Sequence, residues 1–258
     1  MKIIDTHAHL DHLENVEEAL QEAYQVGVIG IVTVGEDLAA NRKNLQIQKT
    51  TVNPKIYVAL GIHPGNINVN EIEECLQFIR IHIKEAVAIG ETGLDYWYKW
   101  VRKDEEKKKE QREVFLKQLS LSKEFDLPIV IHSRGAWRDC LTMTKEMGIV
   151  KALFHWYSGP VDILEEILAA GYYVSASPSL AYSPQSREAI SHASLKSILI
   201  ETDSPTFYSS DGKNGFRAEP KDVFRTLKAY CELKKIDEAT AVKSFNSNAR
   251  EFFNIKDN

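Results

Sequence analysis

The chain has 258 residues, of which 43% are hydrophobic and 27% are charged, as in ordinary globular proteins with room for a full core. Its formal net charge of −5 excludes recruitment of nucleic acid by overall charge, so a function on nucleic acid would have to depend on a local site. The three cysteines are widely spaced, which argues against a disulfide framework or a thiolate zinc site.

The N-terminal segment is interrupted by Asp5, His7 and His9 and therefore lacks the apolar region of a signal peptide. No apolar run approaches the ~18 residues that a membrane-spanning helix needs. We therefore expect a cytoplasmic protein with no membrane partner. No feature of the sequence predicts a protein partner.

Short apolar runs alternate with amphipathic segments from one end of the chain to the other. Each run is continuously apolar, as in parallel strands that are buried on both faces. The predicted strands are Lys2–Thr6, Ile29–Val34, Lys55–Leu60, Ala86–Gly90, Pro128–Ile131, Lys151–Phe154, Tyr172–Ala176 and Lys196–Glu201. The predicted helices are Glu14–Gln25, Leu38–Thr51, Asn70–Lys84, Lys103–Phe125, Ala136–Met147, Val161–Ala170, Pro184–Ala193, Pro220–Leu233 and Glu238–Phe253.

Eight strand–helix units in a chain of this length predict an α/β fold, namely a (β/α)8 TIM barrel made of a single domain over residues 1–258. A doubly wound open sheet is the competing fold. It is disfavoured because no glycine-rich phosphate loop follows the first strand.

Two histidines stand at the end of the first predicted strand. His7 and His9 are two residues apart, so their side chains point to the same side of an extended segment. Two imidazoles that face one point in space can grip a metal ion. An isolated His-x-His pair most often lies on the surface without a function. Whether this pair indicates a metal site therefore depends on the residues at the other strand ends.

In a TIM barrel, catalytic groups stand at the carboxyl ends of the strands. Several other predicted strands end in residues that ligate metals. With the first pair, the converging set is His7, His9, Glu91, His132, His155 and Asp203. Six such ligands exceed the needs of one catalytic ion and suit two divalent ions ~3.5–4 Å apart, with Glu91 as the bridge. His12, His82 and His192 do not follow this pattern, and we expect them on the surface without a role.

The longest connection, Tyr96–Gln111, follows the fourth predicted strand and carries a charged run. Such a run is usually a solvated helix face. In the alternative interpretation, basic and aromatic side chains overhang the site, where they hold phosphates and stack bases. Those side chains are Lys99, Arg102 and Lys103 together with Trp97, Tyr98 and Trp100.

The chain resembles the TatD family of metal-dependent deoxyribonucleases, within the amidohydrolase-like barrel enzymes. The matching segments are DTHAHLD (5–11), GIHPG (61–65), IGETGLDY (89–96), LPIVIHSRGAWRD (127–139), FHWYSG (154–159), ETDSP (201–205), RAEP (217–220) and NSNAREFF (246–253). They run nearly end to end and occur in the family's order. Trp156-Tyr157 and Ala218 depart from the residues expected in the family, which leaves substrate preference open.

The resemblance implies the same six metal ligands, and it adds His63 and Arg134 as substrate-binding residues. It also implies cleavage of DNA phosphodiester bonds, as a 3′-exonuclease on single strands. His7, His9 and Asp203 would hold one ion, His132 and His155 the other, with Glu91 between them. Mg²⁺ or Mn²⁺ is expected for activity, with Zn²⁺ as an alternative at the site.

In the expected mechanism, a water activated by the two ions attacks phosphorus, and Asp203 and Glu91 are the catalytic carboxylates. The same centre would also suit hydrolysis of an ester or amide, either in a small molecule or in aminoacyl-tRNA, because an activated water attacks carbonyl carbon as well. A non-catalytic metal-binding protein on a barrel scaffold is the remaining alternative.

Overall fold

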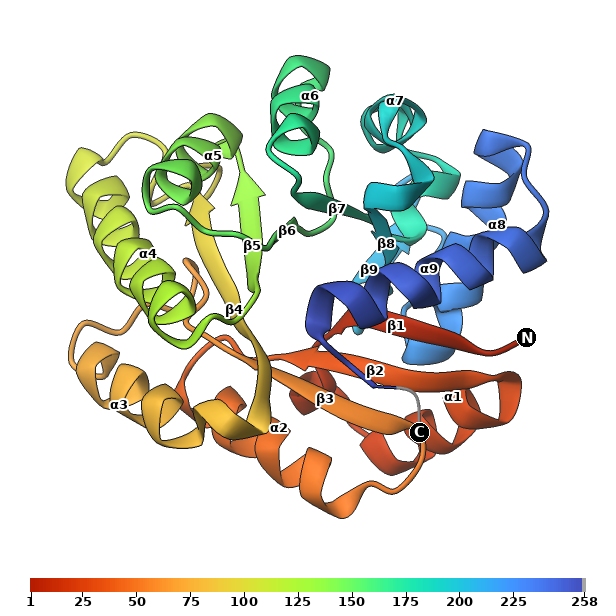
Figure 1. The fold of residues 1–258 in the computed structure, drawn as a ribbon, viewed down its shortest axis with the longest axis horizontal. Helices are drawn as coiled ribbons and strands as arrows, with labels where there is room; N and C mark the ends of the chain where they lie inside the picture. Colours follow the sequence, from red (N-terminus) through yellow and green to blue (C-terminus); the bar gives the residue numbers. More distant parts are fainter. Residues whose placement is uncertain (257–258) are drawn as a thin grey trace.

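The structure is a computed structural model that describes residues 1–256, and within them eight parallel strands follow one another in chain order around one sheet (Figure 1). These strands are β1 (Ile3–Ala8), β2 (Val28–Val34), β3 (Lys55–Leu60), β4 (Ala86–Asp95), β5 (Ile129–Arg134), β6 (Ala152–Phe154), β7 (Tyr173–Ala176) and β8 (Ile198–Ile200). The helices are α1 (Val16–Val26), α2 (Leu38–Thr50), α3 (Ile72–His82), α4 (Glu105–Phe125), α5 (Trp137–Glu146), α6 (Val161–Ala169), α7 (Pro184–His192), α8 (Val223–Lys234) and α9 (Glu238–Phe253).

The sheet closes on itself just beyond the last strand. The His9 amide donates to the Ser204 carbonyl at 2.7 Å, and the Asp203 amide donates to the His7 carbonyl at 2.9 Å. Ala8 and Ser204 form a parallel bridge at the same place. The predicted TIM barrel is therefore confirmed, and its seam joins the first and last segments that carry candidate ligands.

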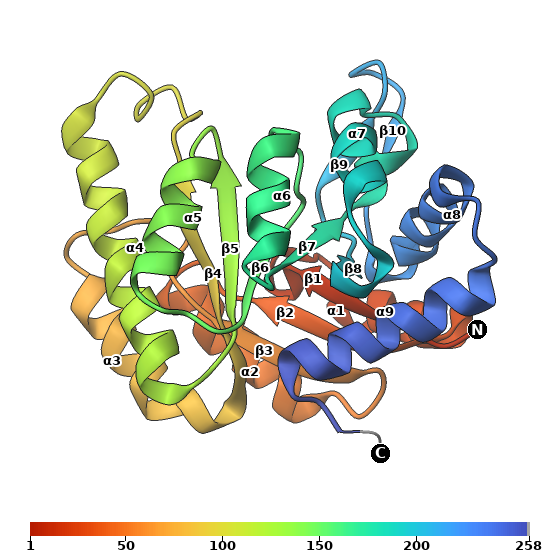
Figure 2. The same cartoon turned by 45° about the horizontal axis from the view of Figure 1, so that its top comes forward.

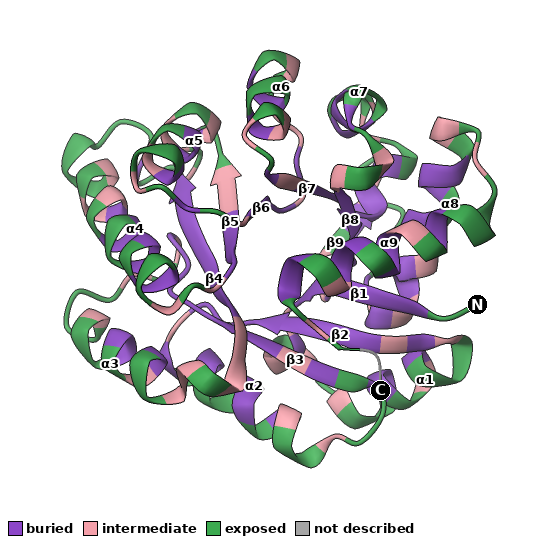
Figure 3. Ribbon diagram, in the orientation of Figure 1, coloured by how far each residue is buried: buried purple, intermediate pink, exposed green. Residues whose placement is uncertain are grey.

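Apolar side chains pack on both sides of the barrel wall. One cluster fills the space between the strands and the surrounding helices. A second cluster takes small residues such as Val32, Ala59 and Ala88 from strands around the barrel, and it therefore occupies the interior. Phe252 and Phe253 of α9 belong to this inner cluster, and Figure 2 shows α9 beneath the strands. Helix α9 thus fills the end of the barrel opposite the strand tips. Figure 3 shows buried strands and helices whose outer faces are exposed.

The differences from the predicted elements lie at their ends. β4 continues to Asp95, five residues beyond the predicted Gly90, and β5 continues to Arg134. The sequence pattern did not indicate either extension, because the added residues are largely polar. Alternate side chains among them face the open end of the barrel instead of an apolar core. The antiparallel pair β9 (Phe207–Ser209) and β10 (Gly215–Arg217) was not predicted, since three-residue strands show no periodicity.

No helix in residues 1–256 combines the length and apolar character needed to cross a bilayer. The three cysteines are buried and unpaired, as their spacing predicted.

Candidate metal centre

The barrel opens at the carboxyl ends of its strands into a cavity of about 670 Å³. Five of the six predicted ligands line it, and the sixth, His7, is fully buried against them. His7 lies in β1 and His9 directly after it, Glu91 in β4, His132 in β5, His155 just after β6, and Asp203 beyond β8. Parallel strands thus bring residues that are up to 196 positions apart in the sequence to one rim.

Glu91 lies at the centre of this group. Its Oε2 atom is 3.2 Å from His7 Nε2 and 3.4 Å from His9 Nε2. Its Oε1 atom is 2.8 Å from His155 Nε2 and 3.1 Å from His132 Nδ1. Each carboxylate oxygen therefore faces a different pair of the predicted histidine ligands, as a bridging ligand would.

Asp203 lies next to His7 and His9, the pair that faces Glu91 Oε2. Its Oδ1 atom is 3.2 Å from His9 Nε2 and 3.5 Å from His7 Nε2, and it is buried and accepts no hydrogen bond from the described residues. A buried carboxylate oxygen without such a partner is costly unless a cation balances it. His7, His9 and Asp203 form one of the three clusters in the described residues whose ligand atoms lie within 4.8 Å of one another.

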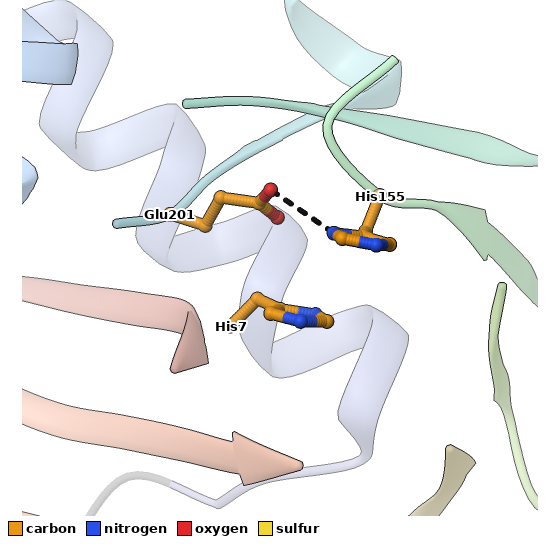
Figure 4. A group of neighbouring side chains, drawn as sticks. All are labelled: His7, His155 and Glu201. Atoms are coloured by element: carbon orange, nitrogen blue, oxygen red, sulfur yellow. Dashed lines mark hydrogen bonds and ion pairs between the residues drawn. The ribbon is translucent and has the colours of Figure 1, made fainter. Parts of the chain in front are cut away.

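A second cluster contains His7, His155 and Glu201, and Figure 4 shows how they lie. The rings of His7 and His155 stack in parallel with centroids 4.0 Å apart. The Glu201 carboxylate lies at the edge of the His155 ring, with Oε1 3.3 Å from Nδ1. The Ser175 hydroxyl donates to the other Glu201 oxygen at 2.5 Å, which fixes the carboxylate.

Three carboxylates outside the predicted ligand set face histidines of that set. Asp95 Oδ2 is 2.9 Å from His132 Nε2, and Glu201 Oε1 is 3.3 Å from His155 Nδ1. Glu36 Oε2 is further away, 3.7 Å from His9 Nδ1, and neither of these two atoms forms a hydrogen bond within the described part of the chain. In each case the carboxylate faces the ring nitrogen that points away from Glu91. Hydrogen-bonded pairs such as those of Asp95 and Glu201 fix the ring orientation and tautomer of metal-ligating histidines.

The charges in the cavity control its protonation. Burial raises the pKa of Glu91, but the neighbouring His155 and other imidazoles hold that pKa well below its usual value. Burial lowers the pKa of His9, but the neighbouring carboxylates of Asp203 and Glu91 raise it to about 10. The pKa of His155 is likewise raised well above its usual value, against burial, by Glu91 and Glu201. His9 and His155 therefore retain their protons, because the carboxylates next to them favour a positive charge.

The residues present fit divalent metal ions. The donor set consists of imidazole nitrogens and carboxylate oxygens, which suit Zn²⁺, Mn²⁺ and, through the carboxylates, Mg²⁺. Cations would replace the protons on His9 and His155 and satisfy the Asp203 oxygen.

His63 also faces the centre, but its hydrogen bonding and its pKa differ from those of the predicted histidine ligands. It groups with Glu91 and His132, and its Nε2 atom is 3.6 Å from Glu91 Oε1. The backbone amide of Gly65 donates to its Nδ1 at 3.0 Å, so Nε2 carries the proton of the neutral ring. Burial lowers the pKa of His63 to about 3, which keeps the ring neutral. His63 is therefore a hydrogen-bond donor toward the cavity.

Other residues line the cavity around this centre. Arg134 is exposed on its wall, and Trp156 lines it with its indole N–H donating to the Ser179 hydroxyl at 2.9 Å. Ala218, the other departure from the family pattern, is fully buried. His12 is half-exposed, as a surface residue should be, but it also lines the cavity, and its Nε2 lies 3.1 Å from Glu36 Oε2.

Two glycines allow the backbone to approach closely here. A Cβ atom at Gly61 would lie 2.5 Å from the carbonyl carbon of Gly90 and 2.6 Å from the Glu91 carbonyl oxygen. Gly93 has φ of +134°, a conformation that other residues rarely adopt. Glycine at these two positions lets β3 and β4 present Glu91 at the middle of the rim.

A family model for TatD-related DNases matches residues 4–254. The chain therefore belongs to the TatD family of metal-dependent hydrolases, and the family predicted from the motifs is confirmed.

Relatives match over nearly the whole chain. The deoxyribonuclease TATDN3 of Homo sapiens is 28% identical over 97% of this chain and 94% of its own length. The metal-dependent hydrolase MJ1582 of Methanocaldococcus jannaschii is 32% identical, covering 98% of this chain and 97% of that protein. Among solved structures, YjjV, a TatD homologue from Escherichia coli, superimposes with a TM-score of 0.88 at 26% identity, over 98% of each chain.

Proposed function

We propose that this chain hydrolyses phosphodiester bonds of DNA, trimming single strands from their 3′ ends, at a centre of two divalent ions. The observation that carries this proposal is the position of Glu91, whose two oxygens each face a separate pair of imidazoles. One ion alone would leave half of this ligand set unused. The names of the relatives, deoxyribonuclease and metal-dependent hydrolase, support the choice of substrate.

The ligands divide into two sets. His7, His9 and Asp203 would hold one ion, His132 and His155 the other, and Glu91 would lie between them. When bound, the ions supply Lewis acidity, which makes a water nucleophilic near neutral pH and offsets charge on the phosphoryl oxygens. We expect Mg²⁺ or Mn²⁺ in the active enzyme, with Zn²⁺ as an alternative.

The surrounding side chains have separate tasks. The Asp203 carboxylate would accept the proton of the attacking water, since it is ionised: His9 holds its pKa below the usual value despite burial. His63 would donate a hydrogen bond from its Nε2–H group to a phosphate oxygen, as its tautomer allows. Arg134, exposed on the cavity wall, would pair with a phosphate of the substrate.

We also propose that residues 1–258 act as one hydrolase domain in the cytoplasm, where three unpaired cysteines are stable. A net charge of −5 is compatible with a DNA substrate, because two divalent ions add local charge of about +4.

The test is cleavage of an end-labelled single-stranded DNA oligonucleotide by metal-stripped protein after addition of Mg²⁺, Mn²⁺ or Zn²⁺. We expect a metal-dependent ladder that shortens from the 3′ end and is absent with Asp203→Asn protein prepared in the same way. Intact DNA with every metal would refute the proposal. Turnover of carboxylic esters, amides or aminoacyl-tRNA by the same samples would then assign the centre to acyl chemistry.

A further inference from the structure

The segment between β4 and α4, residues 96–104, presents two large aromatic side chains to solvent. Trp97 is 62% exposed and Trp100 is 57% exposed. Figure 2 shows this segment, here called the β4–α4 loop, rising from the tip of β4 at the open end of the barrel. More than half of each indole ring buries no apolar surface, so two such rings in one short loop point to a binding surface.

The β4–α4 loop is held in place by its own contacts. Asp95 Oδ1 accepts the amides of Trp97 at 2.7 Å and Tyr98 at 3.2 Å. The Val101 side chain is 1% exposed, and its amide donates to the Tyr98 carbonyl at 2.9 Å. The loop is therefore anchored at both Asp95 and Val101, while the two tryptophans project from it.

The aromatic surface is continuous with the cavity. Tyr98 lines the cavity and stacks on Trp100, with ring centroids 4.3 Å apart and planes at 16°. Arg134 also lines the cavity, and its guanidinium lies 6.0 Å from the centroid of the Trp97 ring. Each tryptophan is thus linked by one intervening side chain to the wall of the candidate metal centre.

The loop also has a charge opposite to that of the whole chain. Lys99, Arg102 and Lys103 are exposed, and no acidic residue occurs between Asp95 and Asp104. Aromatic rings interleaved with cations form the surface on which single-stranded nucleic acids stack their bases and pair their phosphates. A duplex keeps its bases stacked on one another and offers little to such rings.

We propose that the β4–α4 loop binds the part of a single-stranded nucleic acid that lies next to the bond being cleaved, with bases stacked on Trp97 and Trp100 and phosphates against Lys99 and Arg102. The proposal rests on the proposed function for the identity of the substrate. It adds that discrimination between single strands and duplexes resides in this loop, outside the ligand set.

Binding is measured separately from cleavage. Full-length protein with its metals is titrated into a fluorescent single-stranded oligonucleotide of about twelve nucleotides with phosphorothioate linkages, and anisotropy is followed. Because each stacked base contributes substantially to affinity, Trp97→Ala and Trp100→Ala should each raise Kd at least about fivefold. Trp100→Phe keeps a stacking ring and should restore most of the affinity. Lys99→Gln should reduce the salt dependence of binding.

Tyr24→Ala is the matched control, because Tyr24 is 47% exposed on α1 and does not line the cavity of the metal centre. Its Kd should equal that of the wild type. Unlabelled duplex of the same sequence should compete at least about tenfold less well than the single strand. Wild-type Kd in both tryptophan variants, or equal competition by the duplex, would overturn the loop proposal. The same oligonucleotide with natural linkages tests cleavage. If it binds as predicted but is not cleaved, the nuclease assignment is overturned and the loop proposal stands.

Discussion

Replacing Asp95 by asparagine tests whether the carboxylates outside the ligand set tune the metal centre. Asp95 is fully buried, and its two oxygens have different partners. Oδ2 faces His132 Nε2 at 2.9 Å, and Oδ1 accepts two backbone amides of the β4–α4 loop. If His132 binds metal through Nδ1, its Nε2 carries a proton and donates to Asp95.

An asparagine of the same shape cannot serve both sides. Its NH₂ group would face either the protonated Nε2 of His132 or the two loop amides, so donors would meet donors in either orientation. Loss of such an outer carboxylate costs about 10- to 100-fold in metal affinity, or about 1.4–2.7 kcal/mol. The larger value is expected here because Asp95 is fully buried.

The assay is calorimetric titration of Mn²⁺ into metal-stripped Asp95→Asn protein, with circular dichroism to verify folding. Asp104→Asn is the matched control, because Asp104 caps the N-terminus of α4 and asparagine caps helices equally well. A folded Asp95→Asn protein that binds Mn²⁺ within about twofold of the wild type would refute the positioning role.

Asp203→Asn should lower turnover at least about 100-fold, as expected for loss of a general base, while the circular dichroism spectrum is unchanged. Retained turnover would remove Asp203 from the mechanism. In metal-stripped protein, the proton on His9 stabilises the fold fully below the ordinary histidine pKa of ~6.5, and this contribution is lost as pH rises through about 10. The Tm of the metal-stripped protein should therefore fall between pH 7 and pH 10, and less so with Mn²⁺ bound; a rising Tm would contradict the proposed charge balance. Mn²⁺ affinity should fall on acidification, because protons compete for the imidazoles, and calorimetry at several pH values would detect an opposite trend.

The six candidate ligands could be chosen from the sequence because the barrel makes a simple geometric rule available. Residues that follow different parallel strands meet at one rim, whatever their distance along the chain. His7 and His9 were the clearest case, since two residues at an extended strand end must point the same way. The structure brings both of them to Glu91 and Asp203.

The supporting carboxylates could not be assigned in the same way. Asp95 and Glu201 stand in the same motifs as the ligands, and Glu36 follows β2, but a sequence does not show which nitrogen of which ring a carboxylate faces. Those contacts depend on side-chain distances of about 3–4 Å, which arise only when neighbouring strands are paired in register. The position of His12 at the cavity has the same origin, since its partner Glu36 lies in a different segment, the one that follows β2.

The most direct test of the proposed two-ion centre is the metal content of Glu91→Ala compared with the wild type. Each protein would be stripped, reconstituted with Mn²⁺, dialysed and measured by elemental analysis, with Glu251→Ala on the exposed side of α9 as the control. The wild type and the control should hold about two Mn²⁺ ions per chain, and Glu91→Ala should hold fewer than about one, because both ligand sets lose their shared carboxylate. Full occupancy in folded Glu91→Ala protein would contradict the proposed bridging role of Glu91.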